Sequence, residues 1–114
     1  MSWRKLCDLR DVPMVSMRAF EVDGTKLLLL RGASSFAVIP DSCPHMAASL
    51  SEGIFDGEVL TCNKHLWQWS IADDGKAIGI AELDLMTYPT KEVDDVVYVD
   101  LSSVFRYEYE LEAE

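Results

Sequence analysis

The sequence predicts an all-β domain, built as a sandwich or a barrel, and three features support this fold class. Short apolar segments alternate with turn residues along most of the chain. Three pairs of these segments are separated by Asp-Gly or Asp-Asp sequences, which indicate β-hairpin turns. No long stretch between Trp3 and Asp100 has the 3.6-residue period of an amphipathic helix.

The first half of the chain contains four expected strands. The first runs from Trp3 to Leu9 and includes Cys7, which we expect to pack as a small core residue. The second and third strands, 15–22 and 26–31, flank Asp23-Gly24 and form a predicted hairpin. The fourth, 35–39, ends at Pro40, because proline cannot donate to a β-ladder.

The second half predicts a short strand over 58–61 and two further hairpins. Strands 67–71 and 76–80 flank Asp73-Asp74-Gly75, and strands 91–93 and 96–99 flank Asp94-Asp95. From Phe105 onward, apolar and charged residues alternate strictly, so we expect a final strand with an acidic face that packs on the domain. The chain is therefore divided into a domain over 1–103 and an acidic tail over 104–114.

Charge and composition exclude several classes of partner. The chain has 114 residues and a net charge of −10, with 10 basic against 20 acidic side chains. Nucleic acid and anionic membrane surfaces are poor partners for such a chain. No uninterrupted apolar run is longer than that of Leu27 to Leu30, which is far too short to span a membrane. The N-terminus has no signal-peptide pattern, so we expect a cytoplasmic monomer.

Residues 40–66 form a long segment with little regular pattern, and this segment contains all the candidate metal ligands. One pair is Cys43-Pro44-His45, and the other is Cys62-Asn63-Lys64-His65. Sixteen residues separate His45 from Cys62. His45 and His65 are the only two histidines in the sequence. An irregular segment of this length in a small domain is usually functional.

Two cysteines and two histidines can hold either a zinc ion or a [2Fe–2S] cluster. Common zinc fingers take both cysteines from one loop and both histidines from another. Here each loop supplies one of each, which suits two neighbouring metals that both loops bridge. The spacing favours the iron–sulfur cluster, and a zinc-stabilised binding module is the alternative.

The pattern C-x-H, sixteen residues, C-x-x-H resembles the Rieske [2Fe–2S] signature. The strings Leu50-Ser51-Glu52-Gly53 and 61–67 are similar to the Rieske ferredoxins of toluene-4-monooxygenase-type diiron monooxygenases. Thr87-Tyr88-Pro89 and the following hairpin resemble the proline loop and closing hairpin of Rieske ferredoxins generally. The resemblance covers residues 3–100 and implies an antiparallel β-sandwich or barrel with a small cluster-binding subdomain, about 40–70, made of two ligand loops.

The resemblance implies one Rieske [2Fe–2S] cluster, with Cys43 and Cys62 on the inner iron and His45 and His65 on the outer iron. It also implies a one-electron carrier between an NAD(P)H-dependent flavin reductase and a terminal diiron oxygenase, with no catalysis of its own. Both partners would compete for the surface near His45 and His65. The alternatives are a ferredoxin of a ring-hydroxylating dioxygenase and the Rieske small subunit of a nitrite-reductase-like enzyme.

Six residues are expected to form the cluster environment or to contact partners. Pro44 and Pro89 would shape the loops and keep water from the sulfurs, and Trp67 would cover the cluster or meet the partner. The other three are Met46, Lys64 and Leu66. The ligand loops contain no additional cysteine for the disulfide found in high-potential Rieske proteins. The sequence therefore predicts a reduction potential nearer to about −150 mV than to +300 mV.

Overall fold

The computed structural model describes residues 2–32, 35–44, 49–64, 66–71, 73–81 and 83–102. These residues form three antiparallel sheets and two short 3₁₀ helices, with no α-helix among them, so the predicted all-β fold is confirmed. No helix among the described residues is long and apolar enough to cross a membrane. The acidic face predicted from Phe105 lies outside the described residues.

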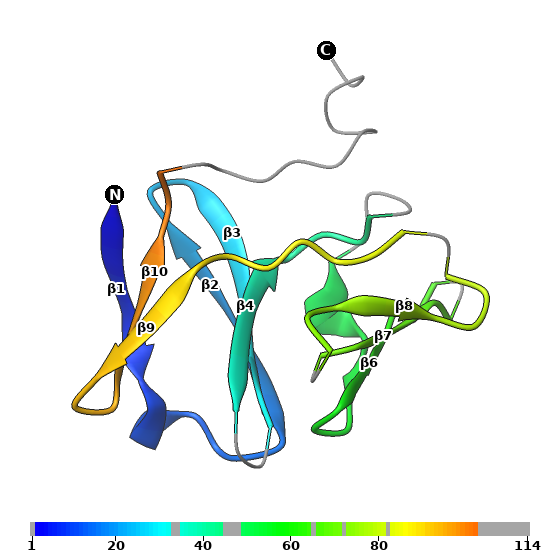
Figure 1. Ribbon diagram of the computed structural model, residues 1–114, viewed down its shortest axis with the longest axis horizontal. Coiled ribbons are helices and arrows are strands. Elements are labelled where there is room, and N and C mark those ends of the chain that lie inside the picture. Colours follow the sequence, from blue (N-terminus) through cyan, green and yellow to red (C-terminus); the bar gives the residue numbers. More distant parts are fainter. Residues whose placement is uncertain are drawn as a thin grey trace.

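The first two sheets together form the larger part of the molecule, named here the base (Figure 1). One sheet has the strand order β1-β10-β9, and the other has the order β2-β3-β4. The bounds are β1 Trp3–Asp8, β10 Val96–Asp100, β9 Thr90–Val93, β2 Ser16–Val22, β3 Thr25–Arg31 and β4 Phe36–Pro40. A 3₁₀ helix, η1, covers Leu9–Asp11 directly after β1.

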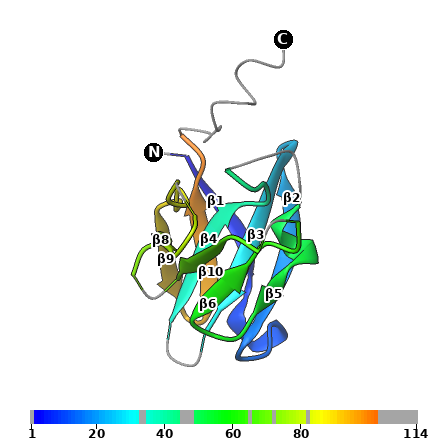
Figure 2. The same ribbon diagram turned by 90° about the vertical axis from the view of Figure 1, so that its right-hand side faces the viewer.

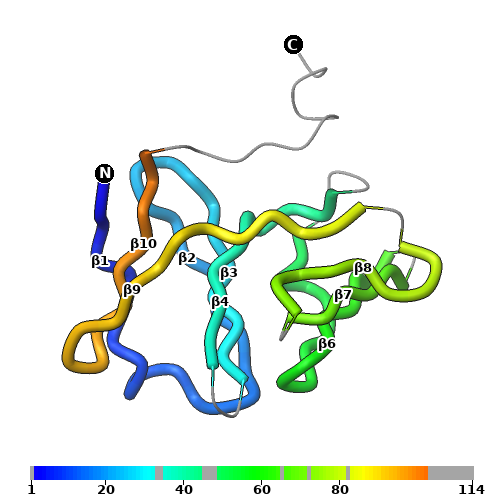
Figure 3. Tube along the Cα trace, in the orientation of Figure 1, coloured from blue at the N-terminus to red at the C-terminus, as the bar shows by residue number. Residues whose placement is uncertain are grey.

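The third sheet and its loops, residues 41–85, form a small unit on the right of Figure 1. Seen from the side in Figure 2, this unit lies in front of β3 and β4. Its four strands follow chain order, and a second 3₁₀ helix precedes them. The bounds are η2 Leu50–Glu52, β5 Ile54–Phe55, β6 Val59–Thr61, β7 Gln68–Ser70 and β8 Lys76–Ile78. Beyond it, the segment after residue 83 runs back to β9 in the base (Figure 3).

Two predicted hairpins have the turn geometry that their residues favour. Asp23 and Gly24 have φ of 51° and 79°, and Asp94 and Asp95 have φ of 51° and 68°. Positive φ at both central residues defines a type I′ turn, whose twist matches that of the flanking strands. The aspartates and the glycine tolerate this conformation, which explains why these hairpins can be located from the sequence.

The apolar run Leu27 to Leu30 occupies the centre of the molecule because β3 is buried on both faces. Leu27 and Leu29 pack in the base core with Val12, Val38, Tyr88 and Val99. Leu28 and Leu30 point the other way and join the core of the small unit. Alternate residues of a strand point to opposite faces, so one strand contributes to both cores.

Several element boundaries differ from those predicted. The first strand ends at Asp8, because Leu9 begins η1. Val15 has φ of 58°, which is outside the β region, so β2 begins at Ser16. Gly79 has φ of 62° and ends β8 at Ile78 instead of Ile80.

Candidate metal centre

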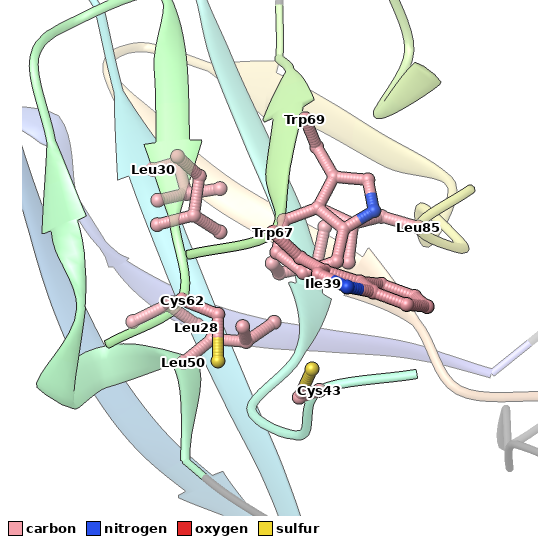
Figure 4. Close-up of a cluster of buried hydrophobic side chains, with 10 residues drawn as sticks. Leu28, Leu30, Ile39, Cys43, Leu50, Cys62, Trp67, Trp69 and Leu85 are labelled. Atoms are coloured by element: carbon pink, nitrogen blue, oxygen red, sulfur yellow. The ribbon is translucent and has the colours of Figure 1, made fainter. Parts of the chain in front are cut away.

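The two cysteines of the predicted ligand pairs come together in the core of the small unit. Cys43 follows the end of β4, and Cys62 follows β6 directly. Both are thiols and both are buried, in one cluster with Leu50, Trp67 and other apolar side chains. Figure 4 shows the two sulfur atoms on the same side of this core, beneath the ring of Trp67 in that view.

His45, His65 and Met46 lie outside the described residues. Among the described residues, no three His, Cys, Asp or Glu side chains gather around a possible metal position. The described part of the centre therefore consists of the two buried thiols and the loops that hold them.

The second ligand loop is closed by two backbone hydrogen bonds. The amide of Cys62 donates to the carbonyl of Trp67 at 2.8 Å, and the amide of Leu66 donates to the carbonyl of Cys62 at 3.1 Å. The closure requires a left-handed residue, and Leu66 supplies it with φ of 58°. Asn63, Lys64 and Leu66 are exposed on this loop, while Cys62 at its base is buried.

The first ligand loop is held at its base by Asp41. The Asp41 carboxylate accepts hydrogen bonds from the Ser51 amide and from Ser51 Oγ, both at 2.9 Å. The Asp41 amide donates to the carbonyl of Lys26 on β3 at 3.1 Å. These bonds close the chain between Asp41 and Ser51, and they fix the fully buried Leu50 in the cysteine core.

A close backbone approach explains the glycine of the Leu50-Ser51-Glu52-Gly53 string. A Cβ atom at Gly53 would lie 2.1 Å from the carbonyl oxygen of Thr61. No real side chain fits at that separation, so only glycine allows η2 to pack against the end of β6. The string thus keeps the two ligand loops close to each other.

Two tryptophans cover the cysteines from the side of the small sheet. Trp67 and Trp69 pack edge to face, with ring centroids 6.4 Å apart, and both belong to the cysteine core. Trp67 is 9% exposed, and its role in covering the cluster stays a prediction. Trp69 is fully buried, and its Nε1 donates to the carbonyl of Leu83 at 2.8 Å.

Residues Leu83 to Leu85 form a third covering segment that the sequence analysis missed. The Leu85 amide donates to the carbonyl of Gly75 at 2.8 Å, and the Asp84 carboxylate accepts from the Ala77 amide at 2.7 Å. Leu85 is buried in the cysteine core. The alternation Leu83-Asp84-Leu85 is a poor sequence signal, because it predicts both leucines on one face, whereas only Leu85 is buried.

Pro89, expected in the cluster environment, is placed with the base. Its side chain is exposed, and its carbonyl accepts from the Asp100 amide at 3.0 Å. The preceding Tyr88 packs in the base core and donates its amide to the carbonyl of Val38 at 2.8 Å. These bonds direct the chain into β9, so the third covering segment is Leu83–Leu85, whereas Pro89 shapes the base. Pro44, beside Cys43, is buried, and its role in keeping water from the sulfurs stays a prediction.

Cys7 does not belong to this centre. It is half-buried and packs against the base core, and burial raises the pKa of its thiol. A small apolar role for this cysteine agrees with the sequence prediction.

The sulfur atoms of Cys43 and Cys62 come from different loops and share one buried core. As thiolates they are suited to bind a metal or a metal cluster. A comparison with known proteins decides which group this is: residues 2–89 match the model of the Rieske [2Fe-2S] domain. The chain belongs to the Rieske [2Fe–2S] family. It therefore carries one Rieske-type [2Fe–2S] cluster.

Relatives of this Rieske chain are components of oxygenase systems. The methanesulfonate monooxygenase ferredoxin subunit of Methylosulfonomonas methylovora is 35% identical over 113 residues, covering 98% of this chain and 91% of the relative. The ferredoxin component of the alkene monooxygenase system of Xanthobacter autotrophicus is 32% identical, covering 75% of this chain and 70% of the relative.

A solved structure extends the likeness to a dioxygenase system. It is a complex of reduced oxygenase and oxidised ferredoxin in carbazole 1,9a-dioxygenase, and the matched chain is 27% identical. The TM-score is 0.78, and the match covers 91% of this chain and 97% of that chain. Together these relatives support an electron-carrier role rather than a catalytic one.

Proposed function

We propose that this Rieske chain carries one electron at a time from an NAD(P)H-dependent flavin reductase to the terminal oxygenase of a multicomponent diiron hydrocarbon monooxygenase. The pair of monooxygenase ferredoxins carries the monooxygenase part of the proposal, and one of them matches almost the whole chain at 35% identity. The diiron hydrocarbon type rests on the resemblance of the strings 50–53 and 61–67. The buried thiol pair beneath a short exposed loop supports it, because a carrier needs its redox group close to a surface.

In this proposal Cys43 and Cys62 hold the inner iron, and His45 and His65 hold the outer iron. When bound, the cluster supplies a group that accepts and releases one electron. The chain's own contribution is to exclude water on the inner side, where Leu50, Trp67 and Leu85 are buried. On the outer side Lys64 and Leu66 are exposed and available to a partner.

The charge of the small unit indicates the kind of surface that it meets. Residues 41–85 contain eight acidic and only two basic side chains. An acidic surface is steered toward a basic one, which raises the rate of encounter more than the affinity. Reductase and oxygenase would use the same exposed loop in turn, so they should compete for a monomeric carrier.

A ring-hydroxylating dioxygenase is a second candidate for the partner. The ferredoxin component of biphenyl 2,3-dioxygenase from Rhodococcus jostii is 31% identical over 102 residues, and the carbazole dioxygenase complex supports the same alternative. An obligate small subunit of a nitrite-reductase-like enzyme would instead form a tight complex that does not exchange.

The first test concerns the cluster and its ligands. Visible and low-temperature EPR spectra are recorded before and after dithionite, with iron and zinc measured on the same sample. We expect a brown protein with about two irons and a rhombic signal on reduction, at a potential in the low Rieske range. Cys43→Ala and His65→Ala should lose the signal, whereas Cys7→Ala, the matched control, should keep it. A colourless protein containing zinc would overturn the proposal.

The second test concerns the partner. The reduced chain is supplied to the terminal oxygenases of alkene monooxygenase, methanesulfonate monooxygenase and biphenyl 2,3-dioxygenase, and product formation is measured. We expect the highest rate with an oxygenase that contains a diiron centre, as detected by Mössbauer spectroscopy. If product forms fastest with the biphenyl enzyme, the chain is better explained as the ferredoxin of a ring-hydroxylating dioxygenase. If none of the three oxygenases forms product, the carrier role is refuted.

A further inference from the structure

Leu66 occupies a position whose backbone and surroundings both disfavour leucine. Its φ of 58° lies in the left-handed region, where glycine and asparagine are the usual residues. Its side chain is 66% exposed although it is a large apolar one. An asparagine here would relieve the backbone strain and would be well solvated.

The conformation of Leu66 is fixed by the ligand loop. The amide of Leu66 donates to the carbonyl of Cys62, and the amide of Cys62 donates to the carbonyl of Trp67. Trp67 itself is anchored in the cysteine core. The exposed leucine therefore projects from a hydrogen-bonded turn, and binding would cost less conformational entropy than ordering an unbonded loop.

We infer that Leu66 is the apolar anchor by which this chain binds its terminal oxygenase. This inference rests on the proposed function and names a contact within it. Strained residues persist where the surrounding structure fixes them, and an outlier of this kind at a functional site points to a role outside folding. A few side chains that become fully buried at the centre of an interface supply most of its binding energy.

The small unit as a whole is acidic, although the charged residue nearest to Leu66 in the chain is the exposed Lys64. Residues 41–85 contain eight acidic and two basic side chains, so the apolar side chain stands on an acidic unit. The complementary partner surface has an apolar recess for Leu66 and is basic beyond the part that faces Lys64. Such an interface combines a short-range apolar contact with long-range attraction that weakens as salt is added.

Val15 provides a matched control elsewhere in the molecule. It has the same φ of 58°, and its apolar side chain is 48% exposed. It lies against Gly57, in the turn before β6, whereas Cys62 and its loop follow the other end of that strand. Val15→Asn removes the same kind of strain and the same kind of side chain without touching the ligand loop.

The experiment compares wild type, Leu66→Asn, Leu66→Met and Val15→Asn as cluster-loaded proteins. Binding is measured by surface plasmon resonance to the oxygenase that wild type serves best and to the reductase of the same system, and thermal midpoints and EPR spectra are recorded. We expect Leu66→Asn to keep its EPR signal, to have an unchanged or higher midpoint, and to bind about tenfold more weakly. Leu66→Met should bind within about threefold of wild type, and Val15→Asn should bind as wild type does.

Three results would overturn the inference. They are equal binding of Leu66→Asn and wild type, an equal loss in Val15→Asn, and a loss of Leu66→Asn binding confined to the reductase. If wild type itself binds no oxygenase and supports no turnover, the proposed function fails instead. If Leu66→Asn does not fold, Leu66→Gly replaces it, because glycine accepts the same backbone conformation.

Discussion

The hydrogen bonds between Asp41 and Ser51 give a sharp prediction about the first ligand loop. The Asp41 carboxylate accepts from both the amide and the hydroxyl of Ser51, each at 2.9 Å and each partly buried. Hydrogen bonds to a charged group contribute roughly 1.5–3 kcal/mol each, and partial exposure lets water replace some of this. Asp41→Ala should therefore lower the free energy of unfolding by about 2–4 kcal/mol.

Asparagine at this position provides the matched comparison. Its amide oxygen can accept from the Ser51 amide, and its amide nitrogen can donate to Ser51 Oγ, so both contacts survive as weaker neutral bonds. We expect Asp41→Asn to cost about 1 kcal/mol, and Ser51→Ala, which removes one of the two bonds, to cost about 1–2 kcal/mol.

The assay is urea denaturation of the cluster-loaded protein, followed by far-UV circular dichroism and by visible absorbance. With a slope of about 2 kcal/mol/M, Asp41→Ala should move the midpoint down by about 1–2 M. The cluster should also bleach faster in buffer in Asp41→Asn than in wild type, and fastest in Asp41→Ala. If Asp41→Ala stays within about 0.5 kcal/mol of wild type, the two bonds do not hold the loop and the reasoning is wrong.

Three further predictions concern the rest of the chain. Trp69→Phe puts a smaller aromatic ring in place of the buried indole and leaves the carbonyl of Leu83 without its donor, so it should cost at least about 1–3 kcal/mol in denaturation experiments. Leu28→Ala and Leu27→Ala should each cost about 2–5 kcal/mol, but only Leu28→Ala, which opens the cysteine core, should strongly accelerate cluster bleaching. Hydrogen bonds from backbone amides hold the pKa of Asp100 below its usual 3.8, so its ionised form stabilises the fold at neutral pH. That contribution should disappear as the pH falls below about 4, and Asp100→Asn should show a flatter acid limb in thermal midpoints against pH.

Local chemistry explains the parts of the fold that could be predicted. The turns at Asp23-Gly24 and Asp94-Asp95 adopt positive φ at both central residues, as their residue types favour, so the flanking strands could be placed within one or two residues. The two thiols could be paired because each cysteine has a histidine nearby in the chain. Each of these patterns lies within a short segment of the sequence, so it can be recognised without knowing which distant segments are in contact.

The missed elements depend on contacts between segments distant in sequence. η2 forms where Asp41 binds Ser51, and Gly53 packs against the backbone of Thr61. The segment Leu83–Leu85 is held by Trp69 and by the β7–β8 hairpin. The resemblance of sequence strings puts Pro89 in the cluster environment, whereas its own carbonyl bonds to Asp100 and its neighbour Tyr88 bonds to Val38, both in the base. Residue patterns within one segment do not indicate such partners.

The central strand β3 links the stability of the base to the centre in the small unit. Leu27 and Leu29 belong to one core while Leu28 and Leu30 belong to the other, and all four are fully buried. The amide of Asp41, at the start of the first ligand loop, bonds to Lys26 on the same strand. The buried thiols are thus held against a strand that is fixed on both faces, while Lys64 and Leu66 remain exposed. Rigid support on the inner side and exposure on the outer side suit a carrier, because an electron must reach the surface without the loops unfolding.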